Sequence, residues 1–161
     1  MAKDIWVISD THFGHENIIN YCNRPFKNLH EMHDYMITKW NSVVKDGDKV
    51  YHLGDVYFSE KGRILDKLKG KKRLILGNHD DVKDNYTQKI FSKILMWRMF
   101  PEFGLLLTHV PVYDKMFNQK IMKNIHGHIH NNQYITDKRY KNVSVEVIDY
   151  TPINIEELRV K

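Results

Sequence analysis

The fold of this chain can be predicted from Leu74-Ile75-Leu76-Gly77-Asn78-His79-Asp80, where an apolar run stops at a glycine and three polar residues follow. A short aliphatic run ended by glycine is typical of a buried strand that delivers its next residues to the rim of a sheet. There Asn78 offers a neutral oxygen ligand, and His79 can carry a proton near neutral pH. Asn and Asp also favour turns, so one such stretch alone would indicate only a turn.

The same arrangement recurs four more times along the chain. Strand-like runs at 5–9, 49–53, 104–108 and 123–125 lead into Asp10 and His12, Asp55, His109, and His128 and His130, respectively. Because parallel strands of one sheet send their carboxyl ends to the same edge, these distant residues are expected to converge. The sequence therefore predicts an α/β fold with a site at that edge.

Together with Asn78, these residues supply two carboxylates, one amide and four imidazoles. Oxygen and nitrogen ligands without sulfur suit transition metals, so we expect divalent ions, with manganese first and iron or zinc as alternatives. Seven ligands exceed what one ion uses and fit two ions that share a carboxylate. In Asp10-Thr11-His12 and His128-Ile129-His130 the paired residues would point the same way off an extended backbone. A disordered metal-binding tract is the alternative for the histidines, but this tract directly follows a strand-like run and has Gly127 at the bend, which argues against disorder.

The remaining elements follow from periodicity and end signals. Asn28 and Glu31 have the spacing of a capping box, which predicts a helix from Leu29 to about Val44. Further helices are predicted at 61–69, 84–91 and 153–160, and further strands at 94–99 and 142–147.

The bulk composition fits one soluble globular domain over residues 1–161, with 42% hydrophobic and 28% charged residues. Cys22 is the one cysteine, which excludes an internal disulfide framework and a thiolate cluster; we expect a cytoplasmic location. No signal peptide and no membrane span is predicted. The net charge of +5 favours anionic partners. The basic run at 67–73 is more often a solvated turn than a nucleic-acid patch, so a stable nucleic-acid complex is not predicted.

In chain order, the motifs resemble those of the calcineurin-like metallophosphoesterase superfamily. They are Asp10-Thr11-His12, Gly54-Asp55, Gly77-Asn78-His79-Asp80, Thr108-His109 and Gly127-His128-Ile129-His130. The resemblance covers residues 5–130 and implies a sandwich of two mixed β-sheets flanked by helices. It further implies that one ion is held by Asp10, His12 and His130, that the other is held by Asn78, His109 and His128, and that Asp55 bridges both.

Two segments make the resemblance more specific within the superfamily. Residues 10–19 and 21–26 are similar to a small, single-domain group of predicted phosphoesterases found in bacteria and phages. The protein Ser/Thr phosphatases of the superfamily continue their second motif as an aspartate followed by an arginine. Here Asp55 is followed by Val56-Tyr57-Phe58-Ser59, so protein dephosphorylation is disfavoured.

The resemblance implies a phosphoesterase in which a hydroxide bridging two ions attacks phosphorus in line with the leaving group. His79 would then protonate the departing alkoxide, and Asp80 would hold its ring. The expected substrate is a phosphodiester, nucleotide-like or a cyclic nucleotide. The alternatives are a phosphomonoesterase and, in a different class, a non-catalytic protein-interaction scaffold.

Two further residues are candidates for contacting the substrate. Arg24 could bind a phosphate through its planar guanidinium, or it could pin its own loop. His15 could reach the substrate side of the site, or it could have only a surface role.

Overall fold

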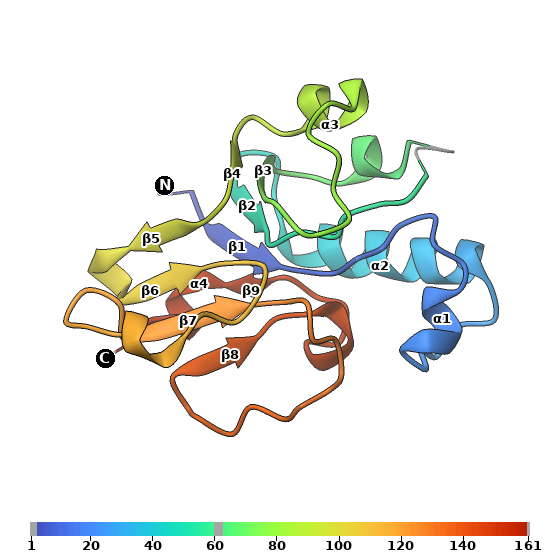
Figure 1. Ribbon diagram of the computed structural model, residues 1–161. Helices are drawn as coiled ribbons and strands as arrows, with labels where there is room; N and C mark the ends of the chain where they lie inside the picture. Colours follow the sequence, from blue (N-terminus) through green and yellow to red (C-terminus); the bar gives the residue numbers. More distant parts are fainter. Residues whose placement is uncertain (1–2, 60–62, 161) are drawn as a thin grey trace.

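The computed structural model describes residues 3–59 and 63–160, which form two β-sheets packed face to face with helices outside them (Figure 1). The first sheet has the order β4-β3-β2-β1-β9, and the second has the order β5-β6-β7-β8. The strands of the first sheet are β1 (Ile5–Ile8), β2 (Lys49–His52), β3 (Lys71–Ile75), β4 (Ile94–Leu95) and β9 (Ile153–Asn154). Those of the second sheet are β5 (Arg98–Phe100), β6 (Leu105–Leu107), β7 (Lys123–His126) and β8 (Tyr140–Asn142). The predicted two-sheet fold is confirmed.

Strand direction brings the motifs together. Strands β1 to β4 run parallel, as do β6, β7 and β8, whereas β9 and β5 are antiparallel to their neighbours. The Ser9 N–H donates to the Val143 carbonyl at 3.0 Å, which ties the end of β1 to the second sheet. The prediction of one parallel sheet edge is therefore wrong in one respect, because the site lies where the ends of two sheets meet.

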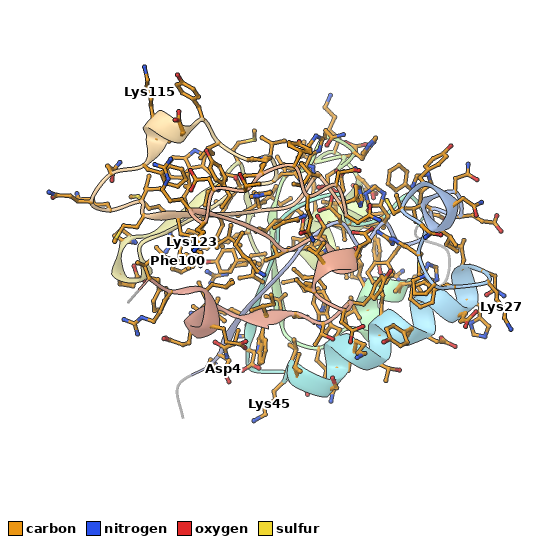
Figure 2. All side chains as sticks on the ribbon, turned by 90° about the horizontal axis from the view of Figure 1, so that it is seen from below. Asp4, Lys27, Lys45, Phe100, Lys115 and Lys123 are labelled. Carbon is orange, nitrogen blue, oxygen red and sulfur yellow. The ribbon has the colours of Figure 1, made fainter. Side chains whose placement is uncertain are left out.

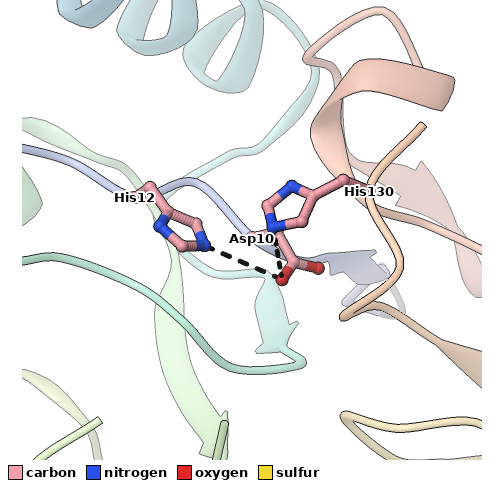
Figure 3. A group of neighbouring side chains, drawn as sticks. All are labelled: Asp10, His12 and His130. Carbon is pink, nitrogen blue, oxygen red and sulfur yellow. Dashed lines mark ion pairs between the residues drawn. The ribbon is translucent and has the colours of Figure 1, made fainter. Parts of the chain in front are cut away.

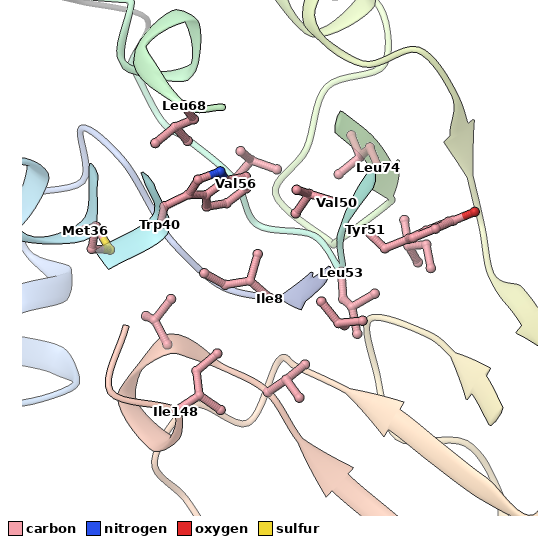
Figure 4. Packing of buried hydrophobic residues seen from close by; sticks show 14 of the residues in the cluster. Ile8, Met36, Trp40, Val50, Tyr51, Leu53, Val56, Leu68, Leu74 and Ile148 are labelled. Atoms are coloured by element: carbon pink, nitrogen blue, oxygen red, sulfur yellow. The ribbon is translucent and has the colours of Figure 1, made fainter. Parts of the chain in front are cut away.

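The first sheet is covered on both faces. Helix α2 (Leu29–Val43) and the 3-10 turn η1 (Ile64–Lys67) lie on one face, and the second sheet lies on the other. Ile8 lies between Trp40 and Leu68 on one side and Ile148 on the other (Figure 4). On the second face, the ring of Tyr51 lies 5.4 Å from that of Phe100. The strands that carry the motifs are thus buried on both sides, which fixes their ends.

The helix predictions hold where capping signals are strong. The Asn28 side chain accepts from the Glu31 N–H at 2.9 Å at the start of α2, and Asp84 caps α3 (Asn85–Ile90) in the same way. The other helical segments are short. They are α1 (Ile18–Tyr21), α4 (Ile155–Leu158), and the 3-10 turns η2 (Pro101–Phe103), η3 (Asp114–Met116) and η4 (Val145–Val147).

Three element predictions need correction. Residues 94–99 form two strands of different sheets, because the chain crosses over at the exposed Met96 and Trp97. The segment 153–160 begins with β9 before the single turn of α4. Within 61–69, only η1 is helical among the described residues, and residues 61 and 62 lie outside them.

The predicted strand at 142–147 is also wrong. The chain leaves β8 at Asn142, whose side-chain oxygen accepts from the backbone N–H of Ser144 at 2.9 Å. This local hydrogen bonding turns the backbone into η4 instead of continuing the ladder. In the described part of the chain, no helix has the length and apolar character needed to cross a bilayer.

Gly54 allows the loops after β2 and β3 to approach each other. Its φ is +100°, and a Cβ there would lie 2.6 Å from the Gly77 Cα and 2.7 Å from the His109 Nδ1. We predict that Gly54→Ala lowers the free energy of unfolding by about 1–3 kcal/mol and weakens metal binding, because the side chain must push these loops apart. Denaturant titration measures the first effect.

The matched control is Gly47→Ala, whose Cβ would meet its nearest neighbour, Lys3, at 3.6 Å. A Gly54→Ala variant as stable as Gly47→Ala would show that the close approach is not required.

Candidate metal centre

One group of predicted ligands follows β1 and β7. The His12 Nε2 lies 3.9 Å from the Asp10 Oδ1, and the His130 Nε2 lies 3.8 Å from the same oxygen (Figure 3). Asp10 and His12 are buried. The three donor atoms lie within 4.8 Å of one another, so one ion could contact all of them.

A second group follows β2, β3, β6 and β7. Asp55, His109 and His128 bring one donor atom each within 4.8 Å of one another. The Asn78 Oδ1 lies 2.9 Å from the His109 Nε2 and 3.0 Å from the His128 Nδ1. The structure therefore brings the predicted seven residues into two neighbouring groups.

Asp55 lies between the two groups. Its Oδ2 is 3.6 Å from the His12 Nε2 and 3.5 Å from the His109 Nε2. Burial alone would raise the pKa of Asp55, but hydrogen bonding and charge from His109 lower it to about 2. The carboxylate is thus ionised at neutral pH and faces both groups at once.

The backbone at the ligands is left-handed. Five of the nine non-glycine residues with positive φ in the described ranges are predicted ligands, namely Asp10, His12, Asp55, His128 and His130. The prediction that the backbone is extended at 10–12 and 128–130 is therefore wrong. Left-handed non-glycine residues are strained, and they cluster at functional sites where the surrounding structure enforces them.

Hydrogen bonds fix the Nδ1 atoms of two imidazoles and leave their Nε2 atoms facing the ligand groups. The His109 Nδ1 lies 2.7 Å from the Leu53 carbonyl oxygen, which can only accept, so this nitrogen carries the proton. The His130 Nδ1 likewise donates to Glu146 at 3.0 Å. In each ring the Nε2 faces a carboxylate, that of Asp55 for His109 and that of Asp10 for His130, and it can bind a metal ion once its own proton has been released.

The donor set fits a divalent cation. The buried Asp10 Oδ1 and His12 Nε2 have no hydrogen-bond partner in the structure, and these are the atoms that face each other in the first group. Leaving buried polar atoms unpaired is costly, and a bound cation would satisfy both. Burial, followed by the charge of His130, lowers the pKa of His12 to about 3 and keeps the ring neutral for coordination.

Comparison with known proteins agrees with this geometry. A model of the calcineurin-like phosphoesterase superfamily domain matches residues 4–146. The chain belongs to this superfamily. It is therefore a metal-dependent phosphoesterase domain, and its substrate is a phosphate ester.

Relatives of this phosphoesterase occur in different kinds of organism. An uncharacterized protein of Methanocaldococcus jannaschii is 40% identical over 167 residues, covering 96% of this chain and 88% of that protein. The Gene 66 protein of Mycobacterium phage L5 is 42% identical over 85 residues, covering 48% of this chain and 40% of that protein. The crystal structure of AQ665, a protein of unknown function from Aquifex aeolicus, has a TM-score of 0.81 and 33% identity, with 98% of each chain covered.

Asp80 occupies a different place from the one predicted. Its oxygens accept from three backbone N–H groups, those of Asp55, Val56 and Gly77, at 2.8–3.0 Å. Both oxygens are thus used to clamp the loop that carries Asp55. Asp80 therefore positions the proposed bridging ligand and does not hold the His79 ring.

The contacts of Arg24 do not fit the first of its two predicted roles, which was binding of a substrate phosphate. The guanidinium is buried and donates to the carbonyls of Asp10 and Thr11 and to Glu146. Since Glu146 also accepts from His130, Arg24 supports both ends of the first ligand group. The alternative that Arg24 pins its own loop fits this geometry, and contact with a substrate phosphate does not.

His79 and His15 lie on the accessible side of the site. His79 is exposed, and its N–H donates to the Asp55 Oδ1 at 3.0 Å. The ring centroid of His79 lies 6.0 Å from that of His12 and 5.1 Å from that of Phe58. Phe58 also stacks on His15 at 4.3 Å. The aromatic rim around His12 thus consists of two predicted histidines and one phenylalanine that the sequence did not single out.

Two more supporting residues were missed because they follow the last motif. The Ser144 hydroxyl donates to the Asp10 Oδ2 at 2.9 Å, and Glu146 accepts from His130 and Arg24. Although burial raises it, the hydrogen bond from His130 and the charge of Arg24 lower the pKa of Glu146 to about 2. Both residues lie where the sequence predicts a plain strand, which concealed them.

We predict that Arg24→Lys weakens metal binding at the first ligand group by about 10–100-fold, because the lysine keeps the charge but loses the fork that spans Asp10, Thr11 and Glu146. Competition with a chromophoric chelator measures the affinity. Arg159→Lys is the control, since Arg159 is partly exposed and pairs with Glu156. Unchanged metal affinity with a raised KM would instead assign Arg24 to the substrate.

Proposed function

We propose that the protein is a dinuclear metal-dependent phosphodiesterase that acts on nucleotide-like phosphate esters. The observation that carries this proposal is the position of the Asp55 Oδ2, within 3.6 Å of an imidazole nitrogen of each group. Asp10, His12 and His130 would hold one ion, Asn78, His109 and His128 would hold the other, and Asp55 would bridge them. Such a pair supplies an activated water and neutralises charge on the phosphoryl oxygens.

His79 is the proposed general acid. It is exposed beside the first ligand group, and its backbone is fixed by the hydrogen bond to Asp55. An imidazole in this place can transfer a proton to the oxygen of the departing alcohol. His15, whose Nδ1 lies 3.3 Å from that of His12, is the next residue to test if His79 is not the acid.

The choice of a diester rests on charge. A diester carries one negative charge, whereas a dianionic monoester needs more cationic groups around its phosphate. Arg24 is committed to the protein's own oxygens, and Val56 follows Asp55 where the protein phosphatases have an arginine. Figure 2 shows the labelled side chains of Lys27, Lys45 and Lys115 at separate points of the molecule.

We predict two bound ions per chain after loading with Mn²⁺, and a loss of affinity at both sites in Asp55→Asn, because a neutral amide bridges two cations poorly. Elemental analysis and calorimetric titration measure both quantities. Asp81→Asn, an exposed acid in the neighbouring loop, is the control. Full occupancy and activity in Asp55→Asn would rule out the bridging assignment.

In a metal-supplemented screen, kcat/KM is predicted to be higher for bis-p-nitrophenyl phosphate than for p-nitrophenyl phosphate, with cyclic nucleotides as the third substrate class. The two nitrophenyl esters share a leaving group, so the comparison isolates the charge and the second ester group. A clear preference for p-nitrophenyl phosphate would favour the alternative, a phosphomonoesterase.

His79→Ala is expected to retain its metals and to hydrolyse a ribose or alkyl ester about 10²–10⁴-fold more slowly, because general acid catalysis contributes this much for a poor leaving group. A nitrophenyl ester should slow far less, since its departing oxygen hardly needs a proton. His30→Ala, exposed on α2, is the control. Equal slowing of both esters, together with metal loss, would make His79 a ligand or structural residue.

A further inference from the structure

A cavity of about 600 Å³ opens beside the second ligand group, and Asn78 and His109 form part of its wall. The rest of the wall comes from the β4–β5 crossover, with Met96 and Trp97, and from the segment after β6. Its volume lies in the range of small-molecule sites. We propose that this cavity holds an uncharged aromatic ring that belongs to the ester group retained on phosphorus after cleavage. This proposal rests on the phosphodiesterase activity proposed above.

The positions of His79 and of the cavity indicate where each of the two ester groups of the substrate would lie. His79, the proposed acid, lies beside His12 and Phe58 and does not line the cavity. The departing alcohol must lie near His79 to receive its proton. The retained ester group then extends toward Asn78 and His109, where the cavity begins. A monoester has no retained group and would leave the cavity empty, which links the cavity to the preference for diesters.

The charged residues that line the cavity limit which substrate group can bind there. Among the residues that line the cavity, Asp80 is the one carboxylate, its oxygens are used by three backbone N–H groups, and no lysine or arginine lines the wall. Beyond the proposed ion at Asn78 and His109, a second phosphate in this cavity would find no lysine or arginine to pair with it, and burying an unpaired charge is strongly unfavourable. The group that enters is therefore uncharged.

The wall also indicates an apolar, flat group. Trp97 is 58% exposed and Met96 is 69% exposed at the rim, and Val110 and Met116 are about half exposed on the other side. Exposed apolar patches beside a polar site are typical of binding surfaces. A ring inserted here would cover this surface and could stack on the indole.

Recognition would depend on contact more than on hydrogen bonding. The Thr108 hydroxyl in the wall donates to the Val110 carbonyl at 2.6 Å and accepts from the Asn124 amide at 2.9 Å, so it is already paired. A phenyl ring and a nucleobase would then bind in a similar way. Selectivity among bases is expected to be weak, whereas selectivity for a ring over a methyl group is expected to be strong.

The kinetic test varies only the retained group. With Mn²⁺-loaded protein, phenyl p-nitrophenyl phosphate should have a kcat/KM at least about tenfold higher than methyl p-nitrophenyl phosphate, mainly through KM, because apolar contact discriminates by roughly this factor. Trp97→Ser and the cavity-filling Val112→Phe should remove most of the difference. Tyr134→Ser, at 70% exposure, is the matched control and should keep it.

A binding test without metal separates this inference from the proposed activity. In metal-free protein, benzyl alcohol should shift the indole N–H resonance of Trp97, which Trp97→Ser identifies. The resonances of Trp40, which is buried, and of Trp6, which donates to Asp48, should remain in place. Adenosine should compete with benzyl alcohol.

Two results would overturn the inference. The first is equal kcat/KM for the phenyl and methyl esters together with an unmoved Trp97 resonance, while diesters are still hydrolysed. The second is dimerisation of the wild-type chain that Trp97→Ser abolishes, since a second copy would then cover the cavity. Absence of all hydrolysis would reject the proposed function instead, and the Trp97 shift would still decide whether the cavity binds a ring.

Discussion

The position of the Asp55 carboxylate is the constraint on which the site depends. Three features fix it: the Asp80 side chain accepts from the Asp55 backbone N–H, the Asp55 Oδ1 accepts from the His79 backbone N–H, and Gly54 lets the loop after β3 approach. As a result, the Asp55 Oδ2 faces a histidine from each ligand group. Without this arrangement, no carboxylate would face both groups.

The sandwich brings the remaining proposed ligands together because both sheets end at the same place. Strands β1 to β3 bring Asp10, His12, Asp55 and Asn78, and β6 and β7 bring the other histidines. Burial on both faces leaves the strand ends little freedom, and the left-handed backbone at five ligands is maintained by this packing. Residues outside the motifs complete the support, since Ser144, Glu146 and Arg24 bind Asp10 or His130 from distant parts of the chain.

Much of the fold and the identity of the site residues could be predicted because their signals are local. An apolar run that ends in a glycine and a polar residue can be recognised within ten residues, as can the Asn28 cap of α2. The supporting contacts could not be predicted, because Arg24 and Glu146 are 122 residues apart and the pattern at 142–147 alternates like a strand. Asp80 was misassigned for a related reason: its neighbour in sequence is His79, but its partners are the backbone N–H groups of Asp55, Val56 and Gly77.

We propose that two ions share Asp55, and electron paramagnetic resonance of the Mn²⁺-loaded protein distinguishes such a pair from two separate ions. Two Mn²⁺ ions roughly 3.5–4 Å apart across a carboxylate are spin-coupled, so we predict a multiline spectrum of a coupled pair at saturation. The same experiment on Asp55→Asn should lose this signal. A spectrum of isolated Mn²⁺ ions in the wild-type protein at full occupancy would show that Asp55 does not bridge them.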